Sequence, residues 1–241
     1  MNLRKKNISV KALKKIRFYR YIFLFIVHPI FIITALSFSS LAAAEYPRGW
    51  WQAFPKDPAK TWEILPQEAE YGKDVILSKR TELGIFSNFA PTPFTLDGKK
   101  YASVEGFWQM MKYPDPQDKD DPRYRKDLLW KYTRDEVSQL TGFEAKDAGE
   151  ATKENYQKLG ISFISYKGKR MEYKGKDKQE HYELIFRTIQ AKIDQNEKAK
   201  TLLKATGTLI LRPDHIQDAD APPAYRYYDI LMKLRSDLAP Y

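Results

Sequence analysis

The sequence predicts a single α+β domain that is predominantly helical and carries a small β-hairpin or sheet. Helix-spaced apolar residues recur along the chain, most clearly in residues 179–195. The strand-like runs are short, and two of them flank Asp97-Gly98, a dipeptide typical of type I′ hairpin turns. The chain contains no cysteine, so its stability must come from an apolar core. About 170 residues outside the N-terminal region are enough to form one.

Residues 1–44 have the pattern of a targeting segment. Eight Lys or Arg lie in residues 1–20, no charged residue lies in 21–44, and the segment ends in Ala42, Ala43 and Ala44. A basic start, an apolar middle and small residues at the end predict a secretory signal peptide. The uncharged stretch is also long enough for an N-terminal membrane anchor. Either alternative predicts an exported protein, periplasmic or secreted, which stays membrane-anchored if the segment is retained.

The net charge of +10 suggests a nucleic-acid partner, but its distribution does not. Beyond residue 44 the chain holds 33 Lys or Arg against 31 Asp or Glu, so the basicity belongs mainly to the targeting segment. A nearly balanced surface attracts phosphate backbones weakly. We therefore expect no strong nucleic-acid binding by the mature chain, and membrane contact only through an uncleaved N-terminal segment.

Residues 45–73 form a Trp- and Pro-rich extension. Four prolines exclude a long helix there, and Trp50, Trp51 and Trp62 can pack the extension on the domain. We expect an ordered wrapper or a linker rather than a sugar-stacking platform, because no polar residues converge there. The domain itself is predicted to span residues 74–241.

The remaining elements follow from periodicity and turn residues. In the first half we expect a buried strand, a loop, the hairpin and a helix, at residues 74–78, 81–89, 93–102 and 103–113. Next we expect a helix, a weaker helix, a strand and a return strand, at 123–140, 146–159, 161–166 and 170–173. The last elements are a long helix, a short helix, a strand, an acidic loop and a final helix, at 179–195, 199–205, 208–211, 212–223 and 225–238. His181 is expected on the outer face of the long helix, which should bury Tyr182, Ile185, Phe186, Ile189 and Ile193.

The helix expected from Ser103 carries the main candidate site. Glu105, Gln109 and Lys112 form a polar stripe beside the apolar face of Val104, Phe107, Trp108 and Met111. With Ser103 as N-cap, Glu105 lies in the first turn, where the helix dipole favours the ionised carboxylate. We therefore expect Glu105 to act as an acceptor or base. The alternative is a glutamate that only stabilises its helix.

Other chemistry has little support in the sequence. Of three histidines, His28 lies in the targeting segment, and His215 beside Asp214, Asp218 and Asp220 is a weak metal or proton-transfer candidate. The acidic loop lacks the glycine and final glutamate of an EF-hand. No G-x-S-x-G, P-loop or G-x-G-x-x-G occurs, which argues against serine hydrolase, P-loop and Rossmann chemistry. We expect no metal and no cofactor.

The stretch FSNFAPTPFTLDGKKYASVEGFWQMMKY (86–113) resembles the signature of the NADAR, or YbiA-like, family. The matching residues are Phe86, Ser87, Asn88, Phe89, Pro93, Asp97, Gly98, Glu105, Gln109 and Lys112. The similarity continues more loosely through residues 188–207 and 229–238. Departures are Gly106 after the glutamate, Met111 in place of a second Gln, and a missing Trp that Tyr173 or Tyr182 could replace.

The resemblance implies a YbiA-like α+β fold and an N-glycosidase that acts on a small nucleotide or an ADP-ribosylated substrate. The essential glutamate of that family falls on Glu105, which would stabilise an oxocarbenium-like sugar or activate water. A second acid would fall on Asp218, with Asp220 as the alternate. Substrate contacts would come from Ser87, Asn88, Phe89, Trp108, Gln109 and Lys112. The alternatives are a non-catalytic ADP-ribose or nucleotide-binding module and a secreted interaction protein.

Overall fold

The computed structural model describes residues 45–238, so the predicted signal or anchor segment, residues 1–44, lies outside the described residues. Its helices are α1 Val104–Met110, α2 Arg134–Ser138, α3 Gly142–Glu150, α4 Lys153–Leu159, α5 Lys178–Gln195, α6 Glu197–Ala205 and α7 Tyr227–Leu238. Its strands are β1 Asp74–Ile76, β2 Phe94–Leu96, β3 Lys99–Tyr101, β4 Ile164–Tyr166, β5 Lys169–Met171 and β6 Ile210–Arg212. Short 3-10 turns include η1 Arg48–Trp51 and η3 Glu82–Phe86. This mixture confirms the predicted α+β class. None of the described helices combines the length and the apolar character that a bilayer crossing requires.

The described strands pair two by two. β2 and β3 form the expected hairpin, with Asp97 and Gly98 at φ 49° and 81°. Positive φ at both central residues is the mark of a type I′ turn. β4 and β5 form a second antiparallel pair. β1 and β6, separated by more than 130 residues, are parallel, with Val75 opposite Leu211.

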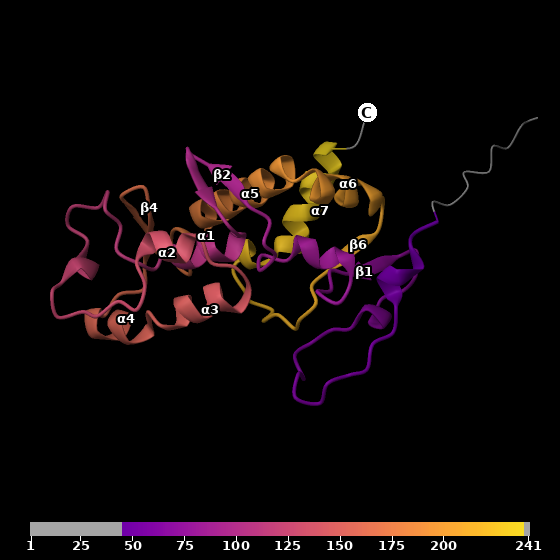
Figure 1. Ribbon diagram of the computed structural model, residues 1–241, viewed down its shortest axis with the longest axis horizontal. Coiled ribbons are helices and arrows are strands. Elements are labelled where there is room, and N and C mark those ends of the chain that lie inside the picture. Colours follow the sequence, from indigo (N-terminus) through magenta and orange to yellow (C-terminus); the bar gives the residue numbers. More distant parts are fainter. Residues whose placement is uncertain (1–44, 239–241) are drawn as a thin grey trace, which may run out of the picture. The chain divides into compact units, whose positions relative to one another are not determined.

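Helix α1 lies among the other helices (Figure 1). It packs against α2 and α3, and against α5. Helix α5 in turn packs on β2, α6 and α7, and α7 packs on β6. One apolar core joins these elements and includes Leu77, Phe86, Phe107, Met111, Ile189 and Leu231. The short helix that carries Glu105 is therefore supported on several sides.

Two predicted helices differ from the structure. Residues 123–140 contain only the short α2, because Thr133 and Glu136 form a capping box that starts a new helix at Arg134. The expected helix at 146–159 is two helices, α3 and α4. They separate near Thr152, whose hydroxyl donates to the carbonyl of Gly149.

The buried face of α5 also differs from the prediction. Tyr182 and Phe186 are half-buried, whereas His181, Leu184, Thr188 and Lys192 are buried beside the expected Ile185, Ile189 and Ile193. The physical reason is that α5 packs against α1 as well as against α6 and α7, so a wider arc of its surface is covered. The predicted surface position of His181 is therefore wrong.

The extension is ordered and packs on the first strand. Trp50 is buried and donates its indole N–H to Glu82 Oε1 at 2.6 Å. Trp51 donates to the carbonyl of Asp74 at 2.9 Å. These two tryptophans therefore attach the extension to β1 and to η3.

Candidate active site

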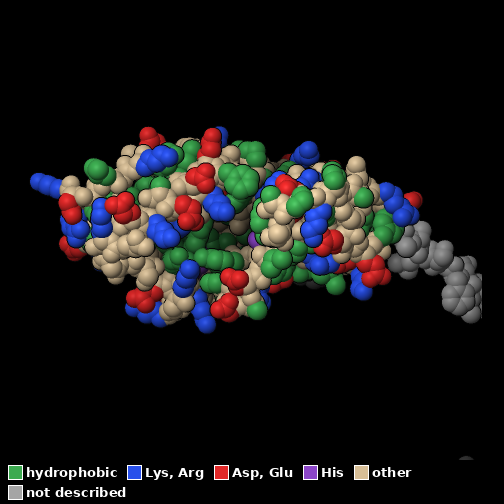
Figure 2. Space-filling view, turned by 90° about the horizontal axis from the view of Figure 1, so that it is seen from below, with side chains coloured by type: hydrophobic (Ala, Val, Ile, Leu, Met, Phe, Trp, Pro, Cys, Tyr) green, Lys and Arg blue, Asp and Glu red, His purple; other side chains and the backbone are tan. Residues whose placement is uncertain are grey.

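A cavity of about 610 Å³ opens beside α1. Its walls come from α1, α3 and α5, from the loop at residues 87–89, and from the segment at 214–217 that follows β6. Figure 2 shows a face on which the protein is hollowed, with apolar side chains inside and charged side chains around the opening. The two ends of α1 are held by different contacts, and each places a side chain in this cavity.

The N-terminus of α1 is fixed in the predicted way. The Ser103 hydroxyl accepts from the Gly106 N–H at 2.9 Å and donates to the Leu140 carbonyl at 2.8 Å. A Cβ on Gly106 would lie 2.5 Å from that same carbonyl oxygen, so only glycine fits after the glutamate. The Glu105 N–H donates to the Asn88 carbonyl at 2.9 Å. Ser103 is thus the N-cap, and the loop at Asn88 is tied to Glu105.

The Glu105 side chain lines the cavity and is only 8% exposed. Its Oε1 accepts from Gln109 Nε2 at 2.8 Å. Burial raises the pKa of Glu105, and the hydrogen bond from Gln109 and the charge of Lys112 oppose that rise only in part. Burial therefore opposes the ionised form that the helix dipole favours, and the role of Glu105 as an acceptor or base stays a prediction. A raised pKa makes the ionised carboxylate a stronger base.

A second stripe of side chains faces α1 from α3. Phe143, Lys146 and Glu150 follow one another at helical spacing and all line the cavity. The charge of Lys146 acts on Glu105, and that of Glu150 on Lys112. The helices approach closely at Gly149, where a Cβ would lie 1.7 Å from Gln109 Oε1. The predicted stripe of Glu105, Gln109 and Lys112 therefore exists and lies opposite complementary charges.

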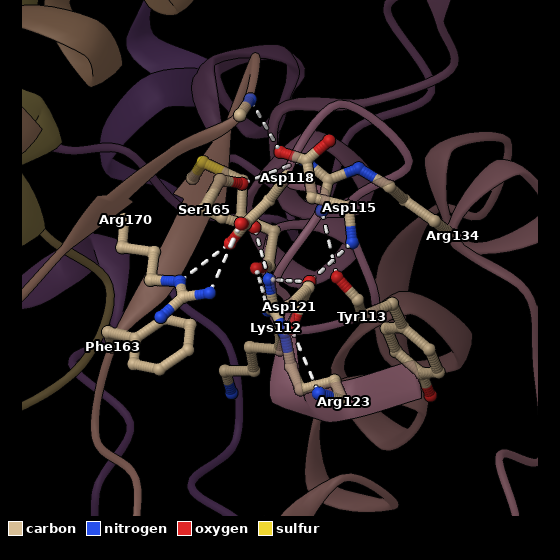
Figure 3. Close-up of polar contacts among 12 residues, drawn as sticks. Lys112, Tyr113, Asp115, Asp118, Asp121, Arg123, Arg134, Phe163, Ser165 and Arg170 are labelled. Atoms are coloured by element: carbon tan, nitrogen blue, oxygen red, sulfur yellow. Dashed lines mark hydrogen bonds and ion pairs between the residues drawn. The ribbon is translucent and has the colours of Figure 1, made fainter. Parts of the chain in front are cut away.

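The C-terminus of α1 is held by a buried ion-pair network (Figure 3). Arg123 donates to the Met111 carbonyl at 2.9 Å and pairs with Asp121 at 2.8 Å, both side chains being fully buried. Arg134 donates to the carbonyls of Met110 and Tyr113 at 3.1 and 2.9 Å. The last carbonyls of a helix have no partner within the helix, so these side chains satisfy them. The network fixes the chain at Lys112, whose side chain enters the cavity.

The loop at residues 87–89 rests on a buried lysine. Lys192 of α5 is 1% exposed, and its Nζ donates to the Ser87 carbonyl at 2.7 Å. Burial lowers the pKa of Lys192 to about 7. This contact connects α5 to the loop whose Asn88 carbonyl accepts from the Glu105 N–H.

The opposite wall is polar and preorganised. Asp214 is 4% exposed and pairs with Lys79 Nζ at 2.5 Å. The Tyr225 carbonyl can only accept, so Gln217 presents its amide nitrogen there, and that nitrogen also approaches His215 Nε2 at 3.3 Å. His215 Nε2 is then the acceptor, and Nδ1–H donates to Asp214 at 2.9 Å. Burial favours the neutral acid, but the His215 hydrogen bond and the Lys79 charge lower the pKa of Asp214.

Aromatic rings form the floor. The Trp108 ring lies 4.4 Å from His181, 5.1 Å from Tyr173 and 5.9 Å from Tyr225, between ring centroids. Burial lowers the pKa of His181 to about 3, so its imidazole is neutral. Tyr173, one of two residues suggested as a replacement for the missing tryptophan, therefore lies in the cavity wall.

The buried polar atoms without a partner gather at this cavity. Within residues 45–238 these side-chain atoms are Asn88 Oδ1, Gln109 Oε1, Gln217 Oε1 and both ring nitrogens of His181. All four residues line the cavity. Buried polar groups are normally paired, so unpaired ones in one place indicate a ligand site. The three amide oxygens are acceptors and would suit a ligand rich in hydroxyl or amino donors.

The structure brings together Glu105 and the six predicted contact residues, Ser87, Asn88, Phe89, Trp108, Gln109 and Lys112. Asp218 and Asp220 are exposed and do not line the cavity. The acid that does is Asp214. No group of three His, Asp or Glu within the described part of the chain is arranged to hold a metal ion.

Sequence reasoning missed Lys79 and His181 as site residues, and it named Asp214 only within the weak candidate around His215. Lys79 follows β1 and Asp214 follows β6, and the carboxyl ends of parallel strands meet at one edge of a sheet. A charged residue shortly after each predicted strand was the available signal, but the pairing of these two strands was not predictable. His181 shares the periodicity of Leu184, Ile185 and Thr188, which would have placed it on the buried face.

Comparisons with known proteins give one likeness. No family model matches the chain, and no curated protein matches it. Among solved structures, the chain is similar to the NMR structure of the E. coli protein YbiA, with 19% sequence identity and a TM-score of 0.42. The match covers 74% of this chain and 89% of that one. An identity this low does not assign the chain to a family.

Proposed function

We propose that this protein hydrolyses the N-glycosidic bond of a ribosyl- or ADP-ribosyl-linked substrate, with Glu105 as the key carboxylate. The observation that carries the proposal is that Glu105 lines one cavity together with Asn88, Gln109 and Gln217, each of which buries an amide oxygen that has no partner in the described residues. Ribose hydroxyls are donors that would satisfy Asn88 Oδ1 and Gln109 Oε1. The resemblance of residues 86–113 to the NADAR signature points to the same chemistry.

In the proposed reaction the bond from ribose C1′ to the base nitrogen breaks, and its electron pair leaves with the base. A water oxygen bonds to C1′, one water proton passes to Glu105, and the base takes up a proton from solvent. Charge on the Glu105 carboxylate stabilises the oxocarbenium-like sugar, and the raised pKa makes it a better base. Asp214, kept ionised by Lys79 and His215, would position ribose or water in place of the exposed Asp218.

The other end of the cavity suits the phosphate of such a substrate. Lys112 and Lys174 line it there, beside Tyr173 and Glu150. These same four residues also line a second cavity of about 510 Å³, to which Lys153 contributes. Lysine side chains bind phosphate as point charges. A ribose over Glu105 with its 5′-phosphate toward Lys112 would therefore use the whole stripe of α1.

The test is to incubate the purified chain with ADP-ribosylated nucleic acid, NAD and ribosylamino-pyrimidines and to separate the products by chromatography. We expect release of free base from at least one of these classes, and loss of release in Glu105→Gln with binding retained. Absence of release from all three, or equal release by Glu105→Gln, would contradict the proposal.

A second candidate is a binding module without turnover. It is favoured by the position of Asp218, the acid expected to complete the site, on the surface rather than in the cavity. Calorimetry distinguishes the two. Binding of ADP-ribose with no product after long incubation would support the module, and any Glu105-dependent release of base would exclude it.

A further inference from the structure

Large apolar side chains are exposed around the mouth of the cavity. Of the seven large hydrophobic residues exposed in the described part of the chain, Trp62, Phe143 and Ile216 line it, with 44%, 61% and 66% exposure. We call these three residues the apolar rim. Exposed apolar groups beside a hollow with converging polar groups are typical of ligand sites. Trp62 belongs to the extension, which therefore contributes to the site.

The apolar rim is held in place by its surroundings. Ile216 N–H donates to the Trp62 carbonyl at 2.9 Å, and Ile64 N–H donates to the Asp214 carbonyl at 2.9 Å. Between them, the backbone of Glu63 forms an isolated antiparallel β-bridge with that of His215. The Glu63 carboxylate accepts from Arg80 through both oxygens, at 2.7 and 2.8 Å. Trp62 is thus tied by backbone pairing to the wall that contains Asp214.

Phe143 is anchored from the other side. Its ring meets that of Phe89 edge to face at 5.3 Å, and the Gly142 N–H donates to the Phe89 carbonyl at 2.9 Å. Because the preceding residue, Asn88, accepts from the Glu105 N–H, Phe143 lies at the Glu105 end of the cavity. Phe89 and Phe143 therefore place aromatic rings at the Glu105 end of the cavity, beside Lys79 and Lys146, while Lys112 and Lys174 lie at the other end.

We propose that the apolar rim binds the planar aromatic base of the substrate, with the ring stacked on Trp62 or Phe143. This inference rests on the proposed function and assigns the part of the site that holds the leaving base. A sugar over Glu105 with its phosphate toward Lys112 directs its base to the apolar rim. The rim favours a ring over a protein partner because its side chains surround a hollow whose lining residues include buried amide oxygens without a partner in the described residues.

The test compares two probes, AMP and ribose 5-phosphate, by calorimetry on the full-length chain. Stacking on an aromatic side chain typically contributes enough free energy to change affinity by about tenfold or more. We expect Trp62→Ala or Phe143→Ala, whichever removes the ring that stacks on the base, to weaken AMP binding by about that factor and to leave ribose 5-phosphate binding unchanged. Tyr124→Ala is the matched control, because Tyr124 is 56% exposed but lies outside the cavity lining. It should alter neither probe.

Three results would overturn the inference. Unchanged AMP affinity in both rim variants would show that the rim does not hold the base. Equal weakening of AMP and ribose 5-phosphate would indicate a collapsed wall rather than lost stacking. Wild-type protein that binds neither probe would also reject it. Rim-dependent AMP binding without base release from any substrate would reject hydrolysis and retain the aromatic site.

Discussion

The two ends of α1 bury polar groups in opposite ways. At the C-terminal end, Arg123 is fully buried, and its guanidinium reaches Asp121, the Met111 carbonyl and the Ser165 hydroxyl. At the N-terminal end, Glu105 accepts one side-chain hydrogen bond, from Gln109, whose own Oε1 has no partner in the described residues. Charge is buried at both ends, but only the first end is saturated with partners.

The difference separates support from function. A buried network in which every group is satisfied makes the structure rigid, and removal of a member leaves an uncompensated charge. A buried carboxylate and amide oxygens without partners reduce stability, and they are tolerated where a ligand completes them. We therefore expect substitutions at the two ends to affect different measurements, stability at the C-terminal end and turnover at the N-terminal end.

The largest effect on stability is expected at the C-terminal end. Arg123→Met leaves Asp121 buried without its counter-charge and should lower the free energy of unfolding by about 3–5 kcal/mol. Arg125→Met is the matched control, since Arg125 and Asp127 form an exposed pair, and should leave stability nearly unchanged. Urea denaturation measures both. Equal effects of the two substitutions would show that the buried network contributes no more to stability than an exposed ion pair.

At the cavity, substitution of the two candidate second acids, Asp214 and Asp218, should have different effects on turnover. Asp214→Asn removes the charge that pairs with Lys79 and accepts from His215, and should reduce turnover about 100-fold, within the usual range for a positioned acid or base. Asp218→Asn changes an exposed side chain outside the cavity and should have little effect on kcat/KM. The reverse order would restore Asp218 as the second acid.

A smaller, pH-dependent effect is expected at Lys192. Its pKa is about 7 in the folded protein against 10.5 for an ordinary lysine, so between these values the unfolded chain binds more protons. The free energy of unfolding should therefore rise with pH in this range, by at most about 1.4 kcal/mol per pH unit for one proton.

Lys192→Met should remove that rise, whereas Lys198→Met, at an exposed position of α6, should retain it. Denaturation at pH 7, 8 and 9 makes the comparison. The same slope in wild type and Lys192→Met would show that Lys192 is charged throughout.

Local signals predicted much of the fold. The hairpin follows from Asp97-Gly98, the start of α1 from Ser103, and the extent of α5 from its apolar period. These features depend on neighbours in the sequence. The helix predicted at 123–140 is wrong in extent, because Arg123 lies in a 3-10 turn and its side chain joins a buried tertiary network, and the capping box at Thr133 starts α2 later.

The candidate site divides in the same way. The half on residues 87–112 was predictable, because one motif holds Asn88, Glu105, Gln109 and Lys112 within a single local unit. The other half depends on long-range pairing. Lys79 meets Asp214 only because β1 pairs with β6, and Trp62 reaches the cavity only because its backbone pairs with Ile216. Neither pairing can be predicted from the local sequence.

Glu105→Gln tests most directly whether the unsaturated end is kept for a ligand. Burial raises the pKa of Glu105, so the folded protein binds more protons than the unfolded chain above pH 4.5, and ionisation costs stability at pH 7. An uncharged amide removes that cost. We predict that Glu105→Gln equals or exceeds the wild type in free energy of unfolding at pH 7, while its turnover falls about 10²- to 10⁴-fold. A clear loss of stability with unchanged turnover would contradict this account and make Glu105 a structural residue.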